Sequence, residues 1–261
     1  MKKPLLDVMF ASKKRKEILL LLKDGPVEME AILRSMQTTR QALLPQIRIL
    51  ENHQVMAHSD DSYALTKTGE LLVDAMVPLI ERIETLDVDI DYWGTHSLEF
   101  IPPHLLSRIE ELGKCKIKNP SISEIYNLPQ GFEEESKKSK SVFGLTTVFH
   151  PNFSSVYEGL TDNGVAVSTI ISKELFENLR KNQYASFKKL VESDKVNLFI
   201  YSKPVRTVFF AMNDFSTIYN ILTKDGEVDH YIVRCHNKKA IGWSKELFEH
   251  YLKDSTPITE I

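Results

Sequence analysis

The sequence is poor in glycine and cysteine and lacks a long apolar run. With 10 glycines in 261 residues it contains no Gly-rich phosphate-binding loop, no HExxH and no GxSxG motif. These motifs are common signatures of nucleotide-binding proteins, zinc proteases and serine hydrolases, so their absence argues against these classes. Residues 18–22 are among the longest apolar runs and fall far short of a membrane span, and the lysine-flanked start lacks the features of a signal peptide. We therefore expect a cytoplasmic protein with no membrane contact, no cofactor and no metal.

The two cysteines, Cys115 and Cys235, lie far apart and form no CxxC or cysteine–histidine pattern. Neither a disulfide framework nor a zinc site is indicated, so we expect both to be reduced, small core residues. A hydrophobic content of 42% with 26% charged residues is that of an ordinary globular protein. The length favours two domains over one.

Charge is distributed unevenly along the chain. Residues 1–54 hold ten Lys/Arg against six Asp/Glu, whereas residues 55–91 hold two against nine. A positive segment can bind nucleic acid through phosphates, although lysines that only solubilise a helix give the same composition.

Three short amphipathic helices are predicted near the N-terminus. Ser12 is expected to cap a helix over 12–23, a second helix covers 28–35, and Thr39 is a good N-cap for a third. The inward stripe of the third helix is Leu43, Ile47 and Leu50. This order suggests a helix-turn-helix.

A hairpin is predicted directly after the third helix, with strands at 55–58 and 63–66 and a turn at 59–62. The run "LENHQVMAHSDDSYALTKTGELL" resembles the end of archaeal and bacterial winged helix-turn-helix regulators, in which this hairpin is the wing. Tyr63 and Leu65 are expected to face inward, Thr66 to cap the next helix, and Gly69 to let that helix pack closely. These roles support the fold, and the function only through it.

Pro45 falls inside the third predicted helix, where it lacks an N–H for the Gln41 carbonyl. Either the helix begins near Leu44 with Pro45 in its first turn, or it begins at Thr39 and is kinked. We favour the second alternative because the third helix of this motif presents its N-terminal residues to base edges.

The winged-helix reading predicts a set of DNA contacts to phosphates and base edges. The expected residues are Lys13, Lys14, Arg15, Thr38, Thr39, Arg40, Gln41, Gln46, Arg48 and Ser62. The wing tip is acidic at Asp60 and Asp61, unlike basic wings that grip the minor groove. An alternative is therefore an interaction adaptor whose winged domain binds protein rather than DNA.

The segment 68–86 carries one apolar helical stripe, interrupted at Pro78 where we expect a bend. The stripe could pack on its own winged domain or on a second subunit, and we favour the second, a homodimer, because operators are usually read by two-fold dimers. We divide the chain into a winged helix-turn-helix domain at 1–68, linker and dimerisation helices at 69–114 with a short helix at 103–112, and an α/β domain at 115–261. The whole is an α+β protein.

Short β-rich runs dominate residues 115–261. They are "VFGLTTVF", "VAVSTII", "NLFIYS", "TVFFAMN", "STIYNIL" and "HYIVRC", with predicted helices at 152–162, 173–192 and 240–253. A crossover helix between the first two strands implies a parallel pair, whereas the later strands look antiparallel, so we expect a mixed sheet.

The whole chain is similar to archaeal winged-helix regulators of methanogens that have a methanogenesis-regulatory (Fil-type) middle domain. The segments that carry this likeness are "IPPHLLSRIEELGKC", "VFGLTTVFHPNF", "GVAVSTIIS" and "AIGWSKELFEHYLKDSTPI". The resemblance implies a transcriptional regulator of archaeal metabolic genes that binds double-stranded DNA.

The C-terminal part also resembles half of a phospholipase-D-type fold, with an HxK at His236, Asn237 and Lys238. Trp243 stands where that enzyme class needs an Asp, and no Gly-Ser-x-x-Asn follows. We therefore expect no enzyme activity and interpret His236 as a turn residue.

Sensing is the more plausible role for the C-terminal domain. Ligands of α/β sheets tend to bind beyond the carboxyl ends of parallel strands, and an arginine beside a strand can pair with an anion. The candidate effector-binding residues are His150, Thr169, Ser172, Tyr201, Arg206 and Arg234.

Overall fold

The structure is a computed structural model that describes residues 3–121, 128–148 and 152–261. It divides into two compact units, residues 1–81 and 82–261, and the division falls inside α5 (Lys67–Leu86). Residues 82–114, expected as linker, belong to the second unit because Trp93 and Leu105 are buried in its core. The chain is therefore divided between residues 81 and 82 and not at the expected boundaries, which follow residues 68 and 114.

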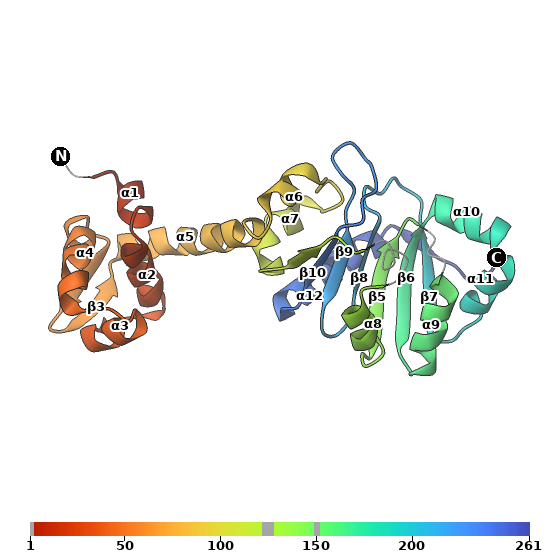
Figure 1. Ribbon diagram of the computed structural model, residues 1–261, viewed down its shortest axis with the longest axis horizontal. Helices are drawn as coiled ribbons and strands as arrows, with labels where there is room; N and C mark the ends of the chain where they lie inside the picture. The colour runs from red at the N-terminus through yellow and green to blue at the C-terminus, as the bar shows by residue number, and fades with distance from the viewer. Residues whose placement is uncertain (1–2, 122–127, 149–151) are drawn as a thin grey trace. The chain divides into compact units, whose positions relative to one another are not determined.

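The first unit contains the three expected helices and the wing (Figure 1). Its elements are α1 (Leu5–Phe10), α2 (Lys13–Leu21), the 3-10 helix η1 (Leu22–Asp24), β1 (Val27–Glu28), α3 (Met29–Ser35), α4 (Arg40–Asn52), β2 (Met56–Ser59), β3 (Ser62–Leu65) and the N-terminal part of α5. The strands form an antiparallel sheet in the order β1-β3-β2. The predicted winged helix-turn-helix arrangement is present, with α1 and β1 as additions.

Two residues fix the junction between wing and α5. The Thr66 hydroxyl accepts a hydrogen bond from Gly69 N at 3.0 Å, so Thr66 caps the helix as predicted. A Cβ atom on Gly69 would lie 1.9 Å from the Val55 carbonyl oxygen, which makes glycine obligatory at this close approach. Tyr63 is buried and Leu65 packs against the same core. The structural roles expected of the "YALTKTG" run are confirmed.

The second unit is built on an eight-stranded mixed sheet in the order β11-β7-β6-β5-β8-β9-β10-β4. Its strands are β4 (Lys116–Lys118), β5 (Ser141–Thr146), β6 (Ala166–Ser172), β7 (Val196–Tyr201), β8 (Phe209–Met212), β9 (Thr217–Asn220), β10 (Ile232–Cys235) and β11 (Ser255–Pro257). Pairs β5–β6 and β6–β7 are parallel and the remaining pairs are antiparallel. The predicted mixed sheet and six of its strands are confirmed, while β4 and β11 were not expected.

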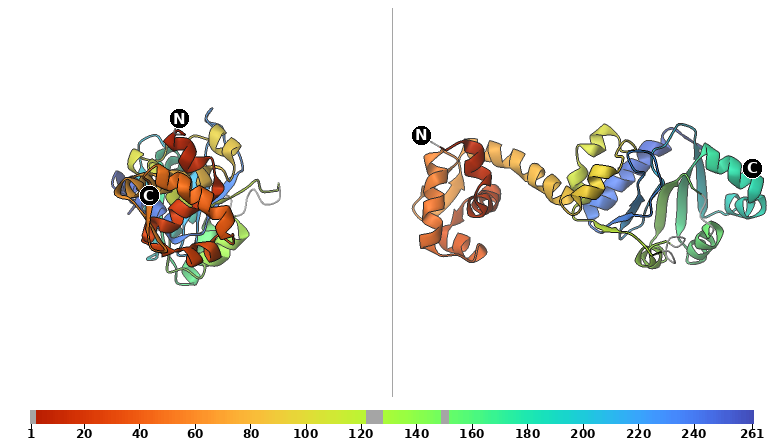
Figure 2. Two further views of the ribbon diagram at one scale, coloured as in Figure 1. Left: turned by 90° about the vertical axis from the view of Figure 1, so that its left-hand side faces the viewer. Right: turned by 45° about the horizontal axis from the view of Figure 1, so that its top comes forward.

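Helices cover both faces of this sheet (Figure 2). They are α6 (Ile90–Thr95), α7 (Pro103–Leu106), the 3-10 helix η2 (Ile109–Leu112), α8 (Gln130–Ser136), α9 (Phe153–Asp162), α10 (Lys173–Asn182), α11 (Tyr184–Val191) and α12 (Lys238–Leu252). The core beneath α6, α7, η2 and α12 contains Phe210 and Trp243, and the core beneath α9, α10 and α11 contains Val167 and Leu198. Since side chains alternate along a strand, β5, β6 and β7 contribute residues to both cores.

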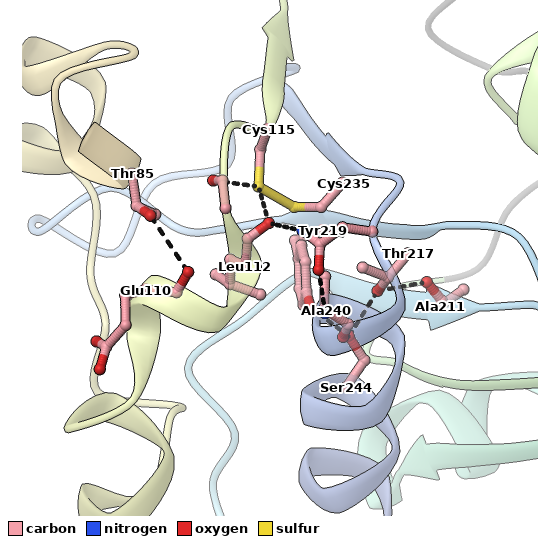
Figure 3. Close-up of a disulfide and its surroundings, with 12 residues drawn as sticks. Thr85, Glu110, Leu112, Cys115, Ala211, Thr217, Tyr219, Cys235, Ala240 and Ser244 are labelled. Carbon is pink, nitrogen blue, oxygen red and sulfur yellow. Dashed lines mark hydrogen bonds between the residues drawn. A yellow bond between two sulfur atoms is a disulfide. The ribbon is translucent and has the colours of Figure 1, made fainter. Parts of the chain in front are cut away.

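Cys115 and Cys235 form a disulfide, which corrects the expectation that both are reduced (Figure 3). They are 120 residues apart in sequence, and no spacing rule pairs two cysteines so far apart. The antiparallel pairing of β4 with β10 brings them together at the start of β4 and the end of β10. Both half-cystines are buried in the core beneath α12.

Candidate nucleic-acid interface and sheet cavity

Helix α4 is positioned by specific structures at both ends. The Thr39 hydroxyl accepts from Ala42 N at 3.4 Å and caps its first turn. The preceding helix α3 ends in a left-handed residue, Gln37 at φ 47°, with Thr38 N bonded to Leu33 O, which is the Schellman arrangement. This tight turn sets the angle at which α4 leaves α3.

Pro45 lies inside helix α4. The helix runs from Arg40 through Pro45 to Asn52, so the alternative in which it begins near Leu44 is wrong. Pro45 is exposed and occupies an interior position of the helix. The kink there stays a prediction.

Three polar side chains on α4 reach the surface of the first unit. Arg40, Gln41 and Arg48 are exposed, opposite the buried stripe of Leu43, Ile47 and Leu50. Arg40 forms an ion pair with Asp61 at the wing tip, with 2.8 Å between Arg40 Nη2 and Asp61 Oδ1. The acidic wing therefore contacts the first residue of the helix.

Arg15 and Gln46 serve the fold of the first unit, which corrects their expected place among the DNA contacts. Arg15 is only 6% exposed. It donates from Nε to Val8 O at 2.6 Å, from Nη2 to Asp7 O at 3.1 Å and from Nη1 to Gln46 Oε1 at 2.7 Å. The guanidinium thus ties α1, α2 and α4 together and is buried within the first unit.

The other expected DNA-contact residues lie at or near the surface. Lys13 is exposed and pairs with Glu17 at 3.7 Å, while Lys14 is half-buried on the same helix. Thr38 and Ser62 are half-buried and Thr39 is exposed. Their contacts with DNA stay a prediction.

The candidate effector residues do not form one site. Thr169 and Arg234 line a common cavity. Ser172 instead caps α10 by accepting from Leu175 N at 3.1 Å, Tyr201 packs edge-on against Tyr251 in the core, and Arg206 pairs with Glu99 at 2.7 Å. These three contacts correct the expected grouping.

His150, the remaining candidate, lies outside the described residues.

The cavity has a volume of about 1320 Å³ and lies on the sheet face opposite α12. Its floor includes Gly144 of β5 and Ala211 of β8, and its sides include Phe132 of α8 and Tyr157 of α9. A Cβ on Gly144 would lie 2.9 Å from Phe210 O, so this part of the floor stays flat. The space is of the size and largely apolar character that proteins use for small molecules.

Polar groups of the cavity wall form two clusters. Tyr157 and Thr169 share a 2.6 Å hydrogen bond, and burial raises the pKa of the Tyr157 phenol. On the other side, Arg234 Nη2 lies 2.8 Å from Glu135 Oε2. Burial opposes ionisation of Glu135, but hydrogen bonds from Ser216 and Arg234 outweigh it and hold its pKa below the ordinary value.

His236 follows β10 at the cavity rim, and Trp243 occupies the position where an HxK enzyme would need an Asp. Trp243 is fully buried and donates from Nε1 to Leu105 O at 2.9 Å. Among the described residues, no cluster of three side chains suited to metal binding occurs. Within the same ranges, none of the helices combines the length and apolar character needed to cross a membrane.

Comparison with known proteins accounts for both units. The family model described as "Methanogenesis regulatory protein FilR1, N-terminal domain" matches residues 4–84, and the one described as its middle domain matches residues 125–254. The chain belongs to the FilR1 family. The FilR1 middle domain coincides with the part of the second unit that holds most of the sheet, and the expected Fil-type resemblance is confirmed.

One curated FilR1 relative matches nearly the whole chain. Methanogenesis regulatory protein FilR1 of Methanothrix harundinacea (strain 6Ac) is 24% identical over 262 residues, which cover 96% of this chain. The chain spans 57% of the length of that relative.

Two solved structures show weaker likeness. TrmBL2, described as an archaeal chromatin protein with a novel mode of DNA binding, is 15% identical over 97% of each chain with a TM-score of 0.44. Phosphatidylserine synthase of Haemophilus influenzae Rd KW20 is 10% identical over 60% of this chain and 37% of that one, with a TM-score of 0.35. At these scores neither likeness supports a functional argument.

Sequence reasoning missed two residues of the candidate sites. The sequence marks Asp61 only as an acidic residue where other wings are basic, although Asp61 contacts Arg40. Asn220 lines the cavity and is buried. Alternation along β9 could have placed Asn220 on the same face as Ile218, but nothing in the sequence marked that face as a cavity wall.

Proposed function

We propose that this chain is a DNA-binding transcriptional regulator that acts as a homodimer and whose second unit binds a small-molecule effector. The observation that carries the DNA-binding part is the capped N-terminus of α4, which presents Arg40 and Gln41 at the surface. Membership of a regulatory family supports it. In this proposal the chain binds double-stranded promoter DNA, controls archaeal metabolic genes and responds to the effector.

The proposed interface uses α4 in the major groove. Arg40 would contact guanine and Gln41 adenine, since their donors and acceptors match those base edges. Phosphate contacts would come from Lys13, Lys14, Thr38, Thr39, Arg48 and Ser62. Arg40 must leave Asp61 to do this, because the pair uses the guanidinium that would read the base.

Helix α5 supplies the proposed dimer contact. Leu72, Met76 and Ile80 pack on the first unit's own core, whereas Leu71, Leu79 and Ile83 are 75%, 46% and 52% exposed. Residues four apart lie on one side of a helix, so the exposed residues form a stripe with Ala75. A second copy of the helix would cover this stripe.

The second unit is proposed as a sensor rather than an enzyme. Its cavity offers a binding volume, and the buried Trp243 fills the position that hydrolysis would require to be acidic. We further propose that the fold of this unit resembles half of a phospholipase-D-type fold.

A second candidate function is favoured by the acidic wing. Asp60 and Asp61 are exposed at the wing tip and would repel a phosphate backbone, which fits a winged domain that binds protein. This adaptor would show no salt-dependent affinity for DNA.

Fluorescence anisotropy separates the two candidates. The full chain is titrated into its own upstream promoter fragment and a scrambled fragment at 50 and 200 mM salt. A regulator that neutralises at least four phosphates should lose roughly 100-fold in affinity between these concentrations. Arg40→Ala should weaken promoter binding by about tenfold or more.

The matched control is Arg206→Ala, which removes the same charge from the second unit, where Arg206 pairs with Glu99. It should leave DNA binding unchanged. Equal weak binding to both fragments, unaffected by Arg40→Ala, would contradict the regulator and favour the adaptor.

A further inference from the structure

The cavity in the second unit has a mainly apolar floor but concentrates polar atoms on three neighbouring strands. β9, β10 and β4 follow one another at one end of the sheet. They contribute Asn220, Arg234 and Lys116, respectively, to the cavity wall. Helix α8 lies beside Arg234, through Glu135 and Gly131. The wall formed by α9 and β6 is apolar apart from the hydrogen-bonded pair of Tyr157 and Thr169.

Asn220 places an unused hydrogen-bond acceptor in this wall. Its Nδ2 donates to Asp229 O at 3.0 Å and to Tyr231 O at 2.9 Å. Because both partners are carbonyl oxygens, the amide cannot be turned over, and Oδ1 must face away from them. Asn220 is 4% exposed, and its Oδ1 has no partner among the described residues. A buried acceptor of this kind calls for a donor.

Arg234 places an unused donor beside that acceptor. It pairs with Ile218 of β9, two residues from Asn220 and on the same face, which puts the two side chains roughly 7 Å apart as diagonal neighbours. Nη2 is held by Glu135, whereas the buried Nε has no partner among the described residues.

Lys116 adds a second positive charge at the same place. It lies directly opposite Arg234 in the β4–β10 register, and like charges in that relation repel. Glu135 offsets one of the two charges. An anion bound between them would remove the repulsion and accept from Arg234 Nε at the same time.

We infer that the cavity binds an amphipathic organic anion: an apolar, ring-sized body on the floor, an acidic oxygen at Arg234 and Lys116, and a hydroxyl or N–H group donated to Asn220 Oδ1. This inference rests on the proposed sensory role of the second unit and gives it a ligand class. The volume accommodates such a molecule with room for its body between α8 and α9.

Two related dyes test each part of the inference. 8-Anilinonaphthalene-1-sulfonate carries a sulfonate, an N–H and two ring systems, and N-phenyl-1-naphthylamine is the same molecule without the sulfonate. Each is titrated by fluorescence into the folded full-length chain without DNA. The sulfonate should bind at one site per chain and about tenfold more tightly than the neutral dye, because its charged hydrogen bond is formed out of water.

Three variants assign the contacts. Arg234→Gln should abolish the preference for the sulfonate while keeping the neutral dye, Asn220→Leu should weaken both dyes, and Ala211→Phe should fill the floor and remove both. Matched controls are Arg206→Gln and Asn197→Leu, the same changes at exposed residues that do not line the cavity. Near-ultraviolet circular dichroism must be native for every variant, because partly unfolded chains also bind these dyes.

The inference is overturned if the folded protein binds neither dye, or if the cavity variants bind both dyes as the controls do. Loss of the sulfonate preference in Arg234→Gln alone supports the anion site. The anisotropy assay tests the proposed function independently of this result. Dye binding without DNA binding would support the anion site and contradict the regulator. DNA binding without dye binding would support the regulator and contradict the anion site.

Discussion

Arg40 Nη2 lies 2.8 Å from Asp61 Oδ1, which joins the first residue of α4 to the tip of the wing. Their side chains are 50% and 56% exposed, and exposed ion pairs of this kind are weak. The pair therefore stabilises the fold little, yet it holds the guanidinium that the proposed interface needs. A ligand phosphate or base can compete with it at small cost.

Asp61→Asn is expected to raise DNA affinity by roughly three- to tenfold, because it releases Arg40 and removes a negative charge near the phosphates. Anisotropy with the promoter fragment measures the change. Asp60→Asn is the control, since it removes an equal charge one residue away without breaking the pair. If both variants gain equally, the ion pair has no part in DNA binding.

Pro45→Ala is expected to stabilise the first unit by about 2 kcal/mol. It restores a helix hydrogen bond to the Gln41 carbonyl, worth up to about 3 kcal/mol with the relieved clash, less about 1 kcal/mol for the freer unfolded chain. Urea unfolding followed by circular dichroism gives the value. Pro26→Ala, in the turn before β1, should be neutral or slightly destabilising, and equal effects at both sites would rule out the helix explanation.

Local chemistry made much of the first unit predictable. Thr39, Thr66 and Gly69 act through neighbours within a few residues or through one close backbone approach, and each was assigned correctly. Arg15 was not, because its burial depends on where α1 and α4 lie in space. A charged residue in a basic run gives no signal of such a role.

The second unit shows where sequence reasoning ends. Hydrophobic runs predicted six strands, but the disulfide depends on β4 lying next to β10, and β4 is only three residues long. The end of a parallel strand points to both Thr169 and Ser172, yet only Thr169 lines the cavity and Ser172 caps α10. Which residues share the cavity is decided by sheet order, and that order is not a local property.

Leu71→Lys with Leu79→Lys is expected to convert the proposed dimer to a monomer, because two charges would be placed in the apolar contact. Sedimentation equilibrium measures the mass, and anisotropy should show weaker binding to a two-fold site. Asp74→Lys places a lysine at an exposed position outside the stripe, where it reverses the charge already present, and should preserve the dimer. A wild-type chain that is monomeric at all concentrations tested would exclude the dimer directly.

Replacing Cys115 and Cys235 together by Ala is expected to lower the stability of the second unit by about 4 kcal/mol, since the cross-link closes a long loop in the unfolded chain. Denaturant unfolding measures the loss. Wild-type protein with dithiothreitol should behave like the double variant, which separates the cross-link from side-chain packing. Two reactive thiols in freshly unfolded protein without reductant would show that the disulfide is not formed.

The stability of the second unit is expected to fall as the pH drops below about 6.5, through His236. Burial lowers the pKa of its imidazole from the ordinary value of 6.5, and the Arg234 charge lowers it further, against the opposing effect of Glu135. A histidine with a depressed folded pKa takes up its proton more readily when unfolded, so its contribution is complete above 6.5 and lost at lower pH. Thermal melts between pH 8 and 5 should therefore show a smaller decline in melting temperature for His236→Gln than for wild type.

His250 should contribute in the same direction, because its pKa is also lowered, first by burial and then by His104. The melting temperature of the double variant His236→Gln/His250→Gln should therefore decline still less with falling pH. Parallel melting curves for all three proteins would contradict the assignment.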